Sequence, residues 1–187
     1  MKKALLFLLM TFVVKTISYS QEKLLVDTKT STIKWIGEYT FYFGGHHGYI
    51  NFKEGYFIKT GDAISGGEFI IDMNSMTNSD IKEQEGKDGL LNHLKDPDFF
   101  DVKKYPLAKL IITKVDYSEK TKARIEANLT LKGVTKPISF MVEFNYKEKE
   151  MKTRFKIDRR KWNVNYTSKF KDGAISDAIG FEVSVKL

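Results

Sequence analysis

The side chains in this chain that could do chemistry are three histidines and a short run of aspartates. His46 and His47 are adjacent, and His93 lies in a distant segment. Three histidines could bind zinc, but neighbours on a strand point to opposite faces of a sheet, so His46 and His47 would not reach one ion. The sequence favours a tight hairpin or bulge around residues 44–48, with one imidazole ring packed inward. We therefore expect no metal site.

The aspartates around the turn at residue 97 have the residue type of a calcium loop but not its order. Asp96, Asp98 and Asp101 lack the glycine at the sixth position and the glutamate at the twelfth that an EF-hand requires. Their pattern is typical of turn and capping residues. The chain also has no G-x-S-x-G, P-loop or H-E-x-x-H motif, and no acidic partner is evident for His47 or His93. The sequence therefore predicts that the protein is not an enzyme and has no cofactor.

Composition limits the partners. The 187 residues suffice for one domain with a sizeable core, and the absence of cysteine excludes disulfides and thiolate ligands. The formal net charge is +7. It falls to +4 without residues 1–20, which carry three lysines and no acidic residue. A mild charge with both signs interspersed argues against a nucleic-acid partner.

The first twenty residues have the layout of a secretory signal peptide. Lys2 and Lys3 form a basic start, residues 4–14 an apolar core, and residues 18–20 a small-x-small cleavage site. The apolar run ends at Lys15 and is shorter than the ~20 residues of a membrane span. We expect cleavage near Ser20, a mature domain of residues 21–187, and a periplasmic or secreted protein that does not span the membrane.

The mature chain alternates apolar and polar residues, which is the period of a half-buried strand. Eight such runs are joined by turns rich in Gly, Asp, Asn and Lys: residues 33–43, 50–58, 66–73, 108–115, 123–131, 138–146, 151–157 and 181–187. Eight antiparallel strands with one apolar face can close into a barrel. The opposite face carries charged and polar residues rather than a lipid-facing band, so we expect a soluble barrel.

One segment interrupts the strands and has the pattern of a helix. Residues 79–95 carry Ser79 or Asp80 as a candidate cap, with Glu83 at the capping-box distance from Asp80. Gly86 and Gly89 weaken the middle, so two short helical pieces are an alternative. The predicted fold is all-β: a closed antiparallel barrel of about eight strands with a short helix between strands.

The inward face of this barrel is the candidate binding surface. It combines large apolar side chains with small ones in the same register. The predicted lining consists of Trp35, Gly37, Tyr39, Phe41, Phe52, Tyr56, Ala127, Leu129, Phe140, Val142, Phe144 and Phe155. Such a face forms either a tunnel that a long chain can enter or a packed core in which small residues accommodate large ones. Periodicity alone favours neither.

Two motifs resemble those of a known family and favour the tunnel. Residues 93–106, HLKDPDFFDVKKYP, resemble the signature of the YceI-like family of exported lipid-binding barrels, and residues 129–136, LTLKGVTK, resemble its L-T-L-x-G-x-T-K hairpin. Shorter similarities follow in order along residues 33–187. The resemblance implies a lipocalin-like barrel that holds a polyisoprenoid, a prenyl-quinone or a similar long apolar lipid. It also implies an exported, non-enzymatic carrier, and a homodimer as one oligomeric state of that carrier.

The resemblance further suggests roles for the segment around the signature. Phe99 and Phe100 would cover the apolar wall of the barrel, and His93, Lys95 and Arg159 are candidates for the mouth, where a lipid head group would lie. The alternative is a stress-related interaction protein whose barrel is packed shut and holds no ligand.

Overall fold

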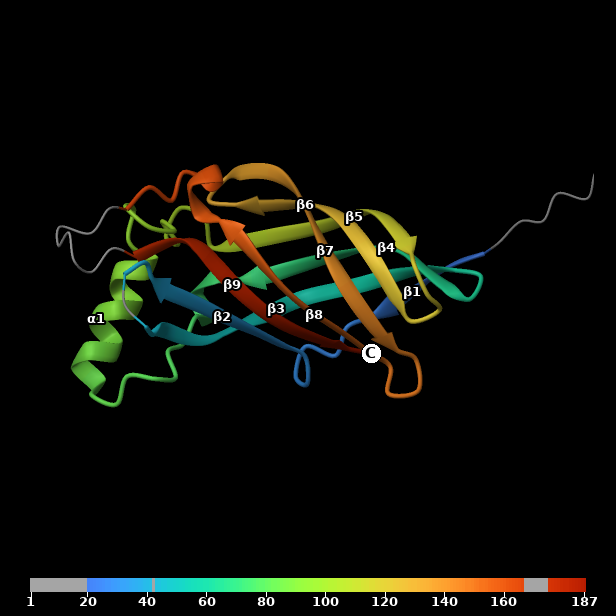
Figure 1. Ribbon diagram of the computed structural model, residues 1–187, viewed down its shortest axis with the longest axis horizontal. Coiled ribbons are helices and arrows are strands. Elements are labelled where there is room, and N and C mark those ends of the chain that lie inside the picture. Colours follow the sequence, from blue (N-terminus) through green and yellow to red (C-terminus); the bar gives the residue numbers. More distant parts are fainter. Residues whose placement is uncertain (1–19, 42, 167–174) are drawn as a thin grey trace, which may run out of the picture.

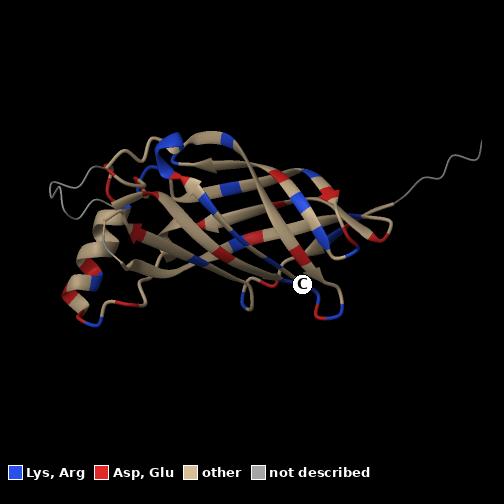
Figure 2. Cartoon of the chain, viewed as in Figure 1, with Lys and Arg blue, Asp and Glu red and all other residues tan. Residues whose placement is uncertain are grey.

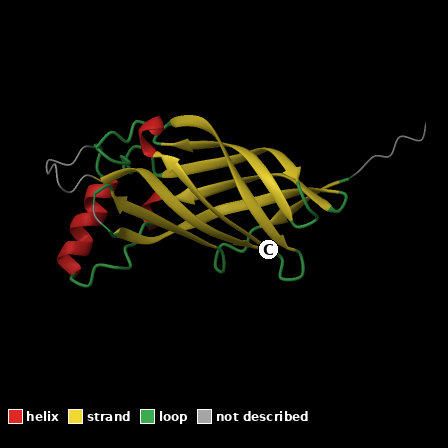
Figure 3. Ribbon diagram, viewed as in Figure 1, coloured by secondary structure: helices red, strands yellow, loops and turns green. Residues whose placement is uncertain are grey.

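A closed antiparallel sheet accounts for most of the chain, with one helix at one end of the barrel (Figures 1 and 3). The computed structural model describes residues 20–41, 43–166 and 175–187, so the predicted signal peptide lies outside the described residues except for Ser20. The strands are β1 (Gln21–Leu25), β2 (Thr32–Tyr39), β3 (Gly45–Thr60), β4 (Ala63–Asp72), β5 (Leu107–Tyr117), β6 (Lys122–Leu131), β7 (Val134–Asn145), β8 (Glu150–Asp158) and β9 (Ile175–Lys186). Two 3-10 helices, η1 (Met73–Ser75) and η2 (Arg159–Trp162), and the helix α1 (Gln84–Lys95) complete the elements.

Eight strands close the barrel in the order β3-β2-β9-β8-β7-β6-β5-β4, and β4 returns to β3. The predicted eight-stranded antiparallel barrel is therefore confirmed. The strand β1 is additional and was not predicted. It finds a partner because β3 has 16 residues, so one edge pairs with β2 at residues 45–50 and with β1 at residues 56–60.

A β-bulge in β3 changes which of its side chains point inward. Phe52 pairs with Ile71 and Glu54 with Ile70. The residue between Phe52 and Glu54 is therefore an extra position on β3 without a partner of its own on β4. Such an insertion reverses the alternation beyond it. The inward residue is therefore Phe57, which is 2% exposed, whereas the ring of Tyr56 lies 4.1 Å from the Lys23 ammonium group. The expected inward position of Tyr56 is corrected to Phe57.

The helix α1 begins five residues later than the predicted start at Ser79. Its N-terminal flanking residue is Glu83, which makes no capping hydrogen bond through its side chain, and Asp80 bonds to β3 instead. The helix is a single piece of 12 residues. None of the helices in the described part of the chain has the length and apolar character of a membrane span.

The segment after α1 folds back onto the barrel, as the adjacent phenylalanines required. Phe99 and Phe100 are 3% and 8% exposed, with ring centroids 4.9 Å apart in an edge-to-face arrangement. Backbone hydrogen bonds from the Phe100 and Val102 amides to the Leu94 and Lys95 carbonyls fix the turn. The expectation that the phenylalanines cover the barrel is confirmed.

Gly48 allows the segment before α1 to lie against β3, and its substitution gives a first prediction. A Cβ at this position would collide with the Thr77 carbonyl oxygen. Gly48→Ala is expected to lower the free energy of unfolding by ~1–3 kcal/mol or more, because two backbones would have to separate. Gly89→Ala is the matched control. Its Cβ has no neighbour within 4 Å in the described part of the chain, and removing a helical glycine should stabilise the protein by up to about 1 kcal/mol. Urea denaturation of both variants measures the difference, and equal effects would contradict the prediction.

Candidate functional site

An apolar cavity of about 320 Å³ runs inside the barrel. All eight barrel strands contribute to its wall, together with α1 and the turn that follows it. At one end the wall includes Leu90, Leu94, Phe99 and Phe100. The volume lies at the lower end of the range of small-molecule pockets, and the mainly aliphatic and aromatic wall is typical of them.

Seven of the twelve predicted lining residues line this cavity: Trp35, Gly37, Tyr39, Phe52, Leu129, Phe140 and Phe155. Ala127 and Val142 are 1% and 4% exposed but pack within the wall. Phe144 lines a second cavity, of about 280 Å³, which is also bordered by Leu24 and Leu187. The inward face is therefore a cavity along part of its length and packed core along the rest.

Phe41 does not line the cavity, and Tyr56 is excluded by the bulge described above. The strand β2 ends at Tyr39, so the alternation that points Trp35, Gly37 and Tyr39 inward does not extend to Phe41. The Phe41 side chain is 70% exposed. The predicted inward position of Phe41 is thus corrected, because the sequence pattern continued beyond the end of the sheet.

Most polar groups of the cavity wall lie near one end, where β2 approaches β3 and β9. They include Tyr39, His46, Ser176 and Arg159, whereas Thr153 lies further along β8. Tyr39 pairs with Ile175, the first residue of β9, and His46 pairs with Gly37. The cavity thus has an apolar length and a polar end.

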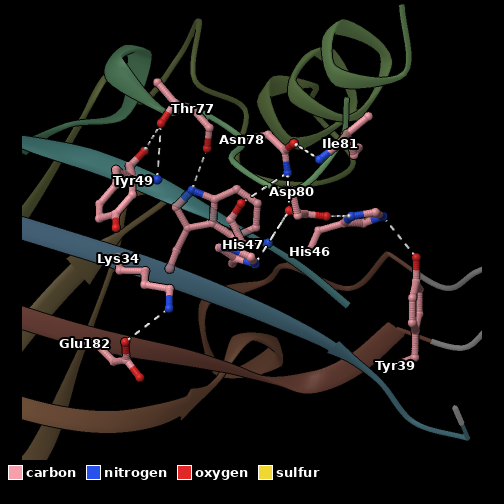
Figure 4. A network of polar contacts seen from close by, with 11 residues as sticks. Lys34, Tyr39, His46, His47, Tyr49, Thr77, Asn78, Asp80, Ile81 and Glu182 are labelled. Atoms are coloured by element: carbon pink, nitrogen blue, oxygen red, sulfur yellow. Dashed lines mark hydrogen bonds and ion pairs between the residues drawn. The ribbon is translucent and has the colours of Figure 1, made fainter. Parts of the chain in front are cut away.

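A chain of hydrogen bonds occupies this polar end (Figure 4). The Tyr39 hydroxyl lies 3.0 Å from His46 Nε2, and His46 Nδ1 lies 2.7 Å from Asp80 Oδ2. Both Tyr39 and His46 line the cavity. His47 does not line the cavity, but its Nδ1 lies 3.7 Å from Asp80 Oδ1, and its backbone N–H donates to the same oxygen at 2.8 Å. Asp80 therefore fixes the imidazole ring of His46.

Further hydrogen bonds hold the Asp80 carboxylate in place and in its charged form. Asn78 Nδ2 donates to Asp80 Oδ1 at 2.7 Å, and Asn78 Oδ1 accepts from the Ile81 N–H at 2.9 Å. Burial alone would raise the pKa of Asp80, but the hydrogen bonds from His47, His46 and Asn78 outweigh it and lower that pKa. Sequence reasoning assigned Asp80 to a helix cap and missed this role. The sequence offered only a weak signal for this role, namely that Asp80 lies in a run of polar residues before the helix.

The three candidate mouth residues have different surroundings. Arg159 lines the cavity, but its guanidinium donates to the backbone carbonyls of Ser176, Val164 and Tyr166. Lys95 Nζ donates to the Asn74 carbonyl at 3.0 Å and is not part of the cavity wall.

His93 also lies outside the cavity wall. Its ring packs edge-to-face on Tyr166, with centroids 4.4 Å apart, and its buried Nε2 has no hydrogen-bond partner among the residues that the structure describes. The structure also brings His93, Asp96 and Asp98 together, with one potential ligand atom from each within 4.8 Å of the others. Both aspartates are exposed and belong to the turn after α1, which is the ordinary setting of turn residues, so we assign no metal here.

Comparisons with known proteins agree with this architecture. A model of the YceI-like domain matches residues 25–187. The chain is 36% identical over 100 residues to a UPF0312 protein of Pseudomonas putida strain W619, a match that covers 50% of each chain. It is 34% identical over 111 residues to a UPF0312 protein of Vibrio vulnificus strain YJ016, covering 54% of this chain and 59% of that protein. The matched part thus spans about half the length of these curated relatives.

Two solved structures share the fold. Burkholderia cenocepacia BcnA superposes with a TM-score of 0.71 at 18% identity, covering 86% of this chain and 98% of BcnA. The Campylobacter jejuni YceI protein has a TM-score of 0.50 at 20% identity, covering 98% of this chain and 97% of that chain.

Proposed function

The chain belongs to the YceI-like family, whose barrel fold binds apolar ligands, and we propose that it carries a long apolar lipid in its barrel cavity. A polyisoprenoid or prenyl-quinone is the proposed ligand class. The observation that supports the proposal most directly is the cavity itself, which is walled by all eight strands and is apolar along most of its length.

The energetics of such a site favour a long hydrocarbon chain. Each methylene transferred from water to an apolar cavity contributes about 0.8 kcal/mol, so a prenyl tail needs no charged anchor to bind. Ordering the ligand opposes this gain, which a preformed cavity reduces. A few hydrogen-bonding groups at one end then suffice to orient the ligand.

We further propose that the protein works in the periplasm or is secreted, and that it acts without catalysis. The signal-peptide pattern of residues 1–20 supports export. Both signs of charge are interspersed along the strands (Figure 2), which fits a lipid carrier better than a nucleic-acid partner. The alternative, an interaction protein with a barrel packed shut, is disfavoured because a packed barrel would not contain a cavity of about 320 Å³.

The proposal predicts that protein purified from its native envelope carries about one lipid per chain. Organic extraction followed by mass spectrometry identifies that lipid and its stoichiometry. Delipidated protein should then take up an added prenyl-quinone, as measured by titration. Extraction that repeatedly yields no lipid, together with no uptake of the prenyl-quinone, would contradict the proposal and favour the packed alternative.

A further inference from the structure

The polar end of the cavity contains a hydrogen-bond chain whose direction can be deduced. An ionised carboxylate only accepts hydrogen bonds. Asp80 Oδ1 already accepts from the His47 N–H and from Asn78 Nδ2, and Oδ2 lies 2.7 Å from His46 Nδ1. His46 Nδ1 must therefore carry the proton that fills this contact.

The rest of the chain follows from that proton. We take the His46 imidazole as neutral. With its proton on Nδ1, such a ring has a lone pair on Nε2, so Nε2 can only accept. The Tyr39 hydroxyl lies 3.0 Å from Nε2 and is consequently the donor. The Tyr39 hydroxyl thus donates its single proton to His46. Toward a ligand in the cavity, the Tyr39 oxygen can then only accept a hydrogen bond.

We infer that the Tyr39 oxygen, oriented by His46 and Asp80, is the head-group subsite and selects lipids whose polar end donates a hydrogen bond. This inference rests on the proposed lipid-carrier function and ranks its ligands: a prenyl alcohol, phenol or quinol is expected to bind more tightly than the corresponding ether or quinone, which still bind through their apolar chains. Matching an acceptor in the protein to a donor in the ligand is a strong source of discrimination, because the wrong partner leaves a buried polar group unpaired.

Other polar groups of the wall are already engaged within the protein. Arg159 directs its guanidinium at backbone carbonyls and at Asp177. Thr153 Oγ1 donates to the Met141 carbonyl at 2.6 Å, and Glu38 pairs with the Lys156 ammonium group at 2.6 Å.

Ser176 serves as the control for the subsite. Its Oγ accepts from the Ala178 N–H at 3.1 Å and also lines the cavity. Ser176→Ala therefore tests whether this hydroxyl, rather than Tyr39, receives the head group.

Two substitutions test this hydrogen-bond chain in different ways: one removes its last member, and the other reverses its donors and acceptors. Tyr39→Phe keeps the ring and removes the oxygen, so the subsite is lost. Asp80→Asn keeps the acceptor Oδ1 for His47 and Asn78 but presents an amide N–H, a donor, to His46 Nδ1. The imidazole proton then moves to Nε2 and donates to the Tyr39 oxygen. The Tyr39 proton becomes free to donate to the ligand.

The experiment compares geranylgeraniol with its methyl ether, which differ by one hydrogen-bond donor, in titrations of delipidated full-length protein. Wild type and Ser176→Ala are expected to bind the alcohol about 3- to 10-fold more tightly than the ether. Tyr39→Phe should abolish the preference by weakening alcohol binding. Asp80→Asn should abolish it by strengthening ether binding, an outcome that loss of folding or a steric effect of the methyl group would not produce.

The outcomes separate this inference from the proposed function. If wild type binds neither prenyl compound, the carrier function itself is contradicted. If all four proteins bind both compounds and Tyr39→Phe retains the preference for the alcohol, the carrier stands and the subsite is wrong. Loss of the preference in Ser176→Ala alone would place the head group at Ser176 and likewise overturn the inference.

Discussion

Replacing Gly37 with leucine is expected to lower prenyl-lipid affinity by roughly 30- to 100-fold while leaving the stability of lipid-free protein nearly unchanged. Gly37 lines the cavity, and among the described residues a Cβ at this position would have one neighbour within 4 Å, the His46 carbonyl oxygen at 3.8 Å. The leucine side chain would thus extend into free volume. It would displace about three methylene groups of the ligand, each contributing about 0.8 kcal/mol, which gives the expected change in affinity.

Ala127→Phe is expected to have the opposite effect, a loss of stability rather than of lipid affinity. Ala127 is 1% exposed and belongs to the packed wall rather than to the cavity. A large side chain there is expected to lower the free energy of unfolding by ~1–3 kcal/mol through overpacking. Ala127→Ser adds little volume and controls for the substitution itself.

Urea denaturation of delipidated protein and titration with a fluorescent prenyl analogue measure the two effects separately. The expected pattern is lost binding with retained stability for Gly37→Leu and lost stability for Ala127→Phe. A Gly37→Leu protein that is strongly destabilised, while its folded fraction binds normally, would show that the space beside Gly37 is ordinary core. The lipid would then have to lie elsewhere.

Arg159→Met is expected to lower the free energy of unfolding by about 3–5 kcal/mol, because it removes several hydrogen bonds to a charged group and leaves backbone carbonyls without their donor. Arg159 is 3% exposed. Its Nε donates to the Ser176 carbonyl at 3.2 Å, and its two Nη atoms donate to the Val164 and Tyr166 carbonyls. Burial lowers the pKa of Arg159, but an arginine remains charged at neutral pH, so its donors stay available.

The neighbouring residue supplies a matched control. The side chain of Arg160 is 56% exposed and forms ion pairs with Asp158 and Asp177 at 3.1 and 3.0 Å. Arg160→Met should therefore lower the free energy of unfolding by at most about 1 kcal/mol.

Arg159→Met also separates a structural role from the head-group role suggested by the sequence. A structural role predicts a large loss of stability, measured by denaturant unfolding of lipid-free protein. If stability were unchanged and lipid affinity fell, Arg159 would bind the head group after all, and its contacts to the backbone carbonyls would contribute little.

The local pattern of the sequence was sufficient to predict eight antiparallel strands with one buried face, a number at which a sheet can close into a barrel. Alternation of apolar and polar residues is a property of each strand by itself, and one apolar face on eight strands requires closure or a second sheet. The same alternation correctly placed Trp35, Gly37, Phe52, Phe140 and Phe155 on the cavity wall. The burial of Phe99 and Phe100 followed from the cost of exposing two adjacent aromatic rings.

Only the tertiary structure decided where the alternation ends or reverses. The bulge between Phe52 and Glu54 turned Tyr56 outward, and the end of β2 left Phe41 exposed. Both features depend on how neighbouring strands pair, which the residues of one strand do not specify.

The division between cavity and packed core, and the polar end of the cavity, were likewise outside the reach of the sequence. Free volume depends on the sizes of side chains on opposite walls, so Gly37 borders a cavity whereas Ala127, another small inward residue, is packed. The Tyr39–His46–Asp80 chain joins residues up to 41 positions apart through hydrogen bonds that exist only once the segment before α1 lies on β3. Sequence periodicity reports which way a side chain points, but the distance to its partner is set by the packing of the whole barrel.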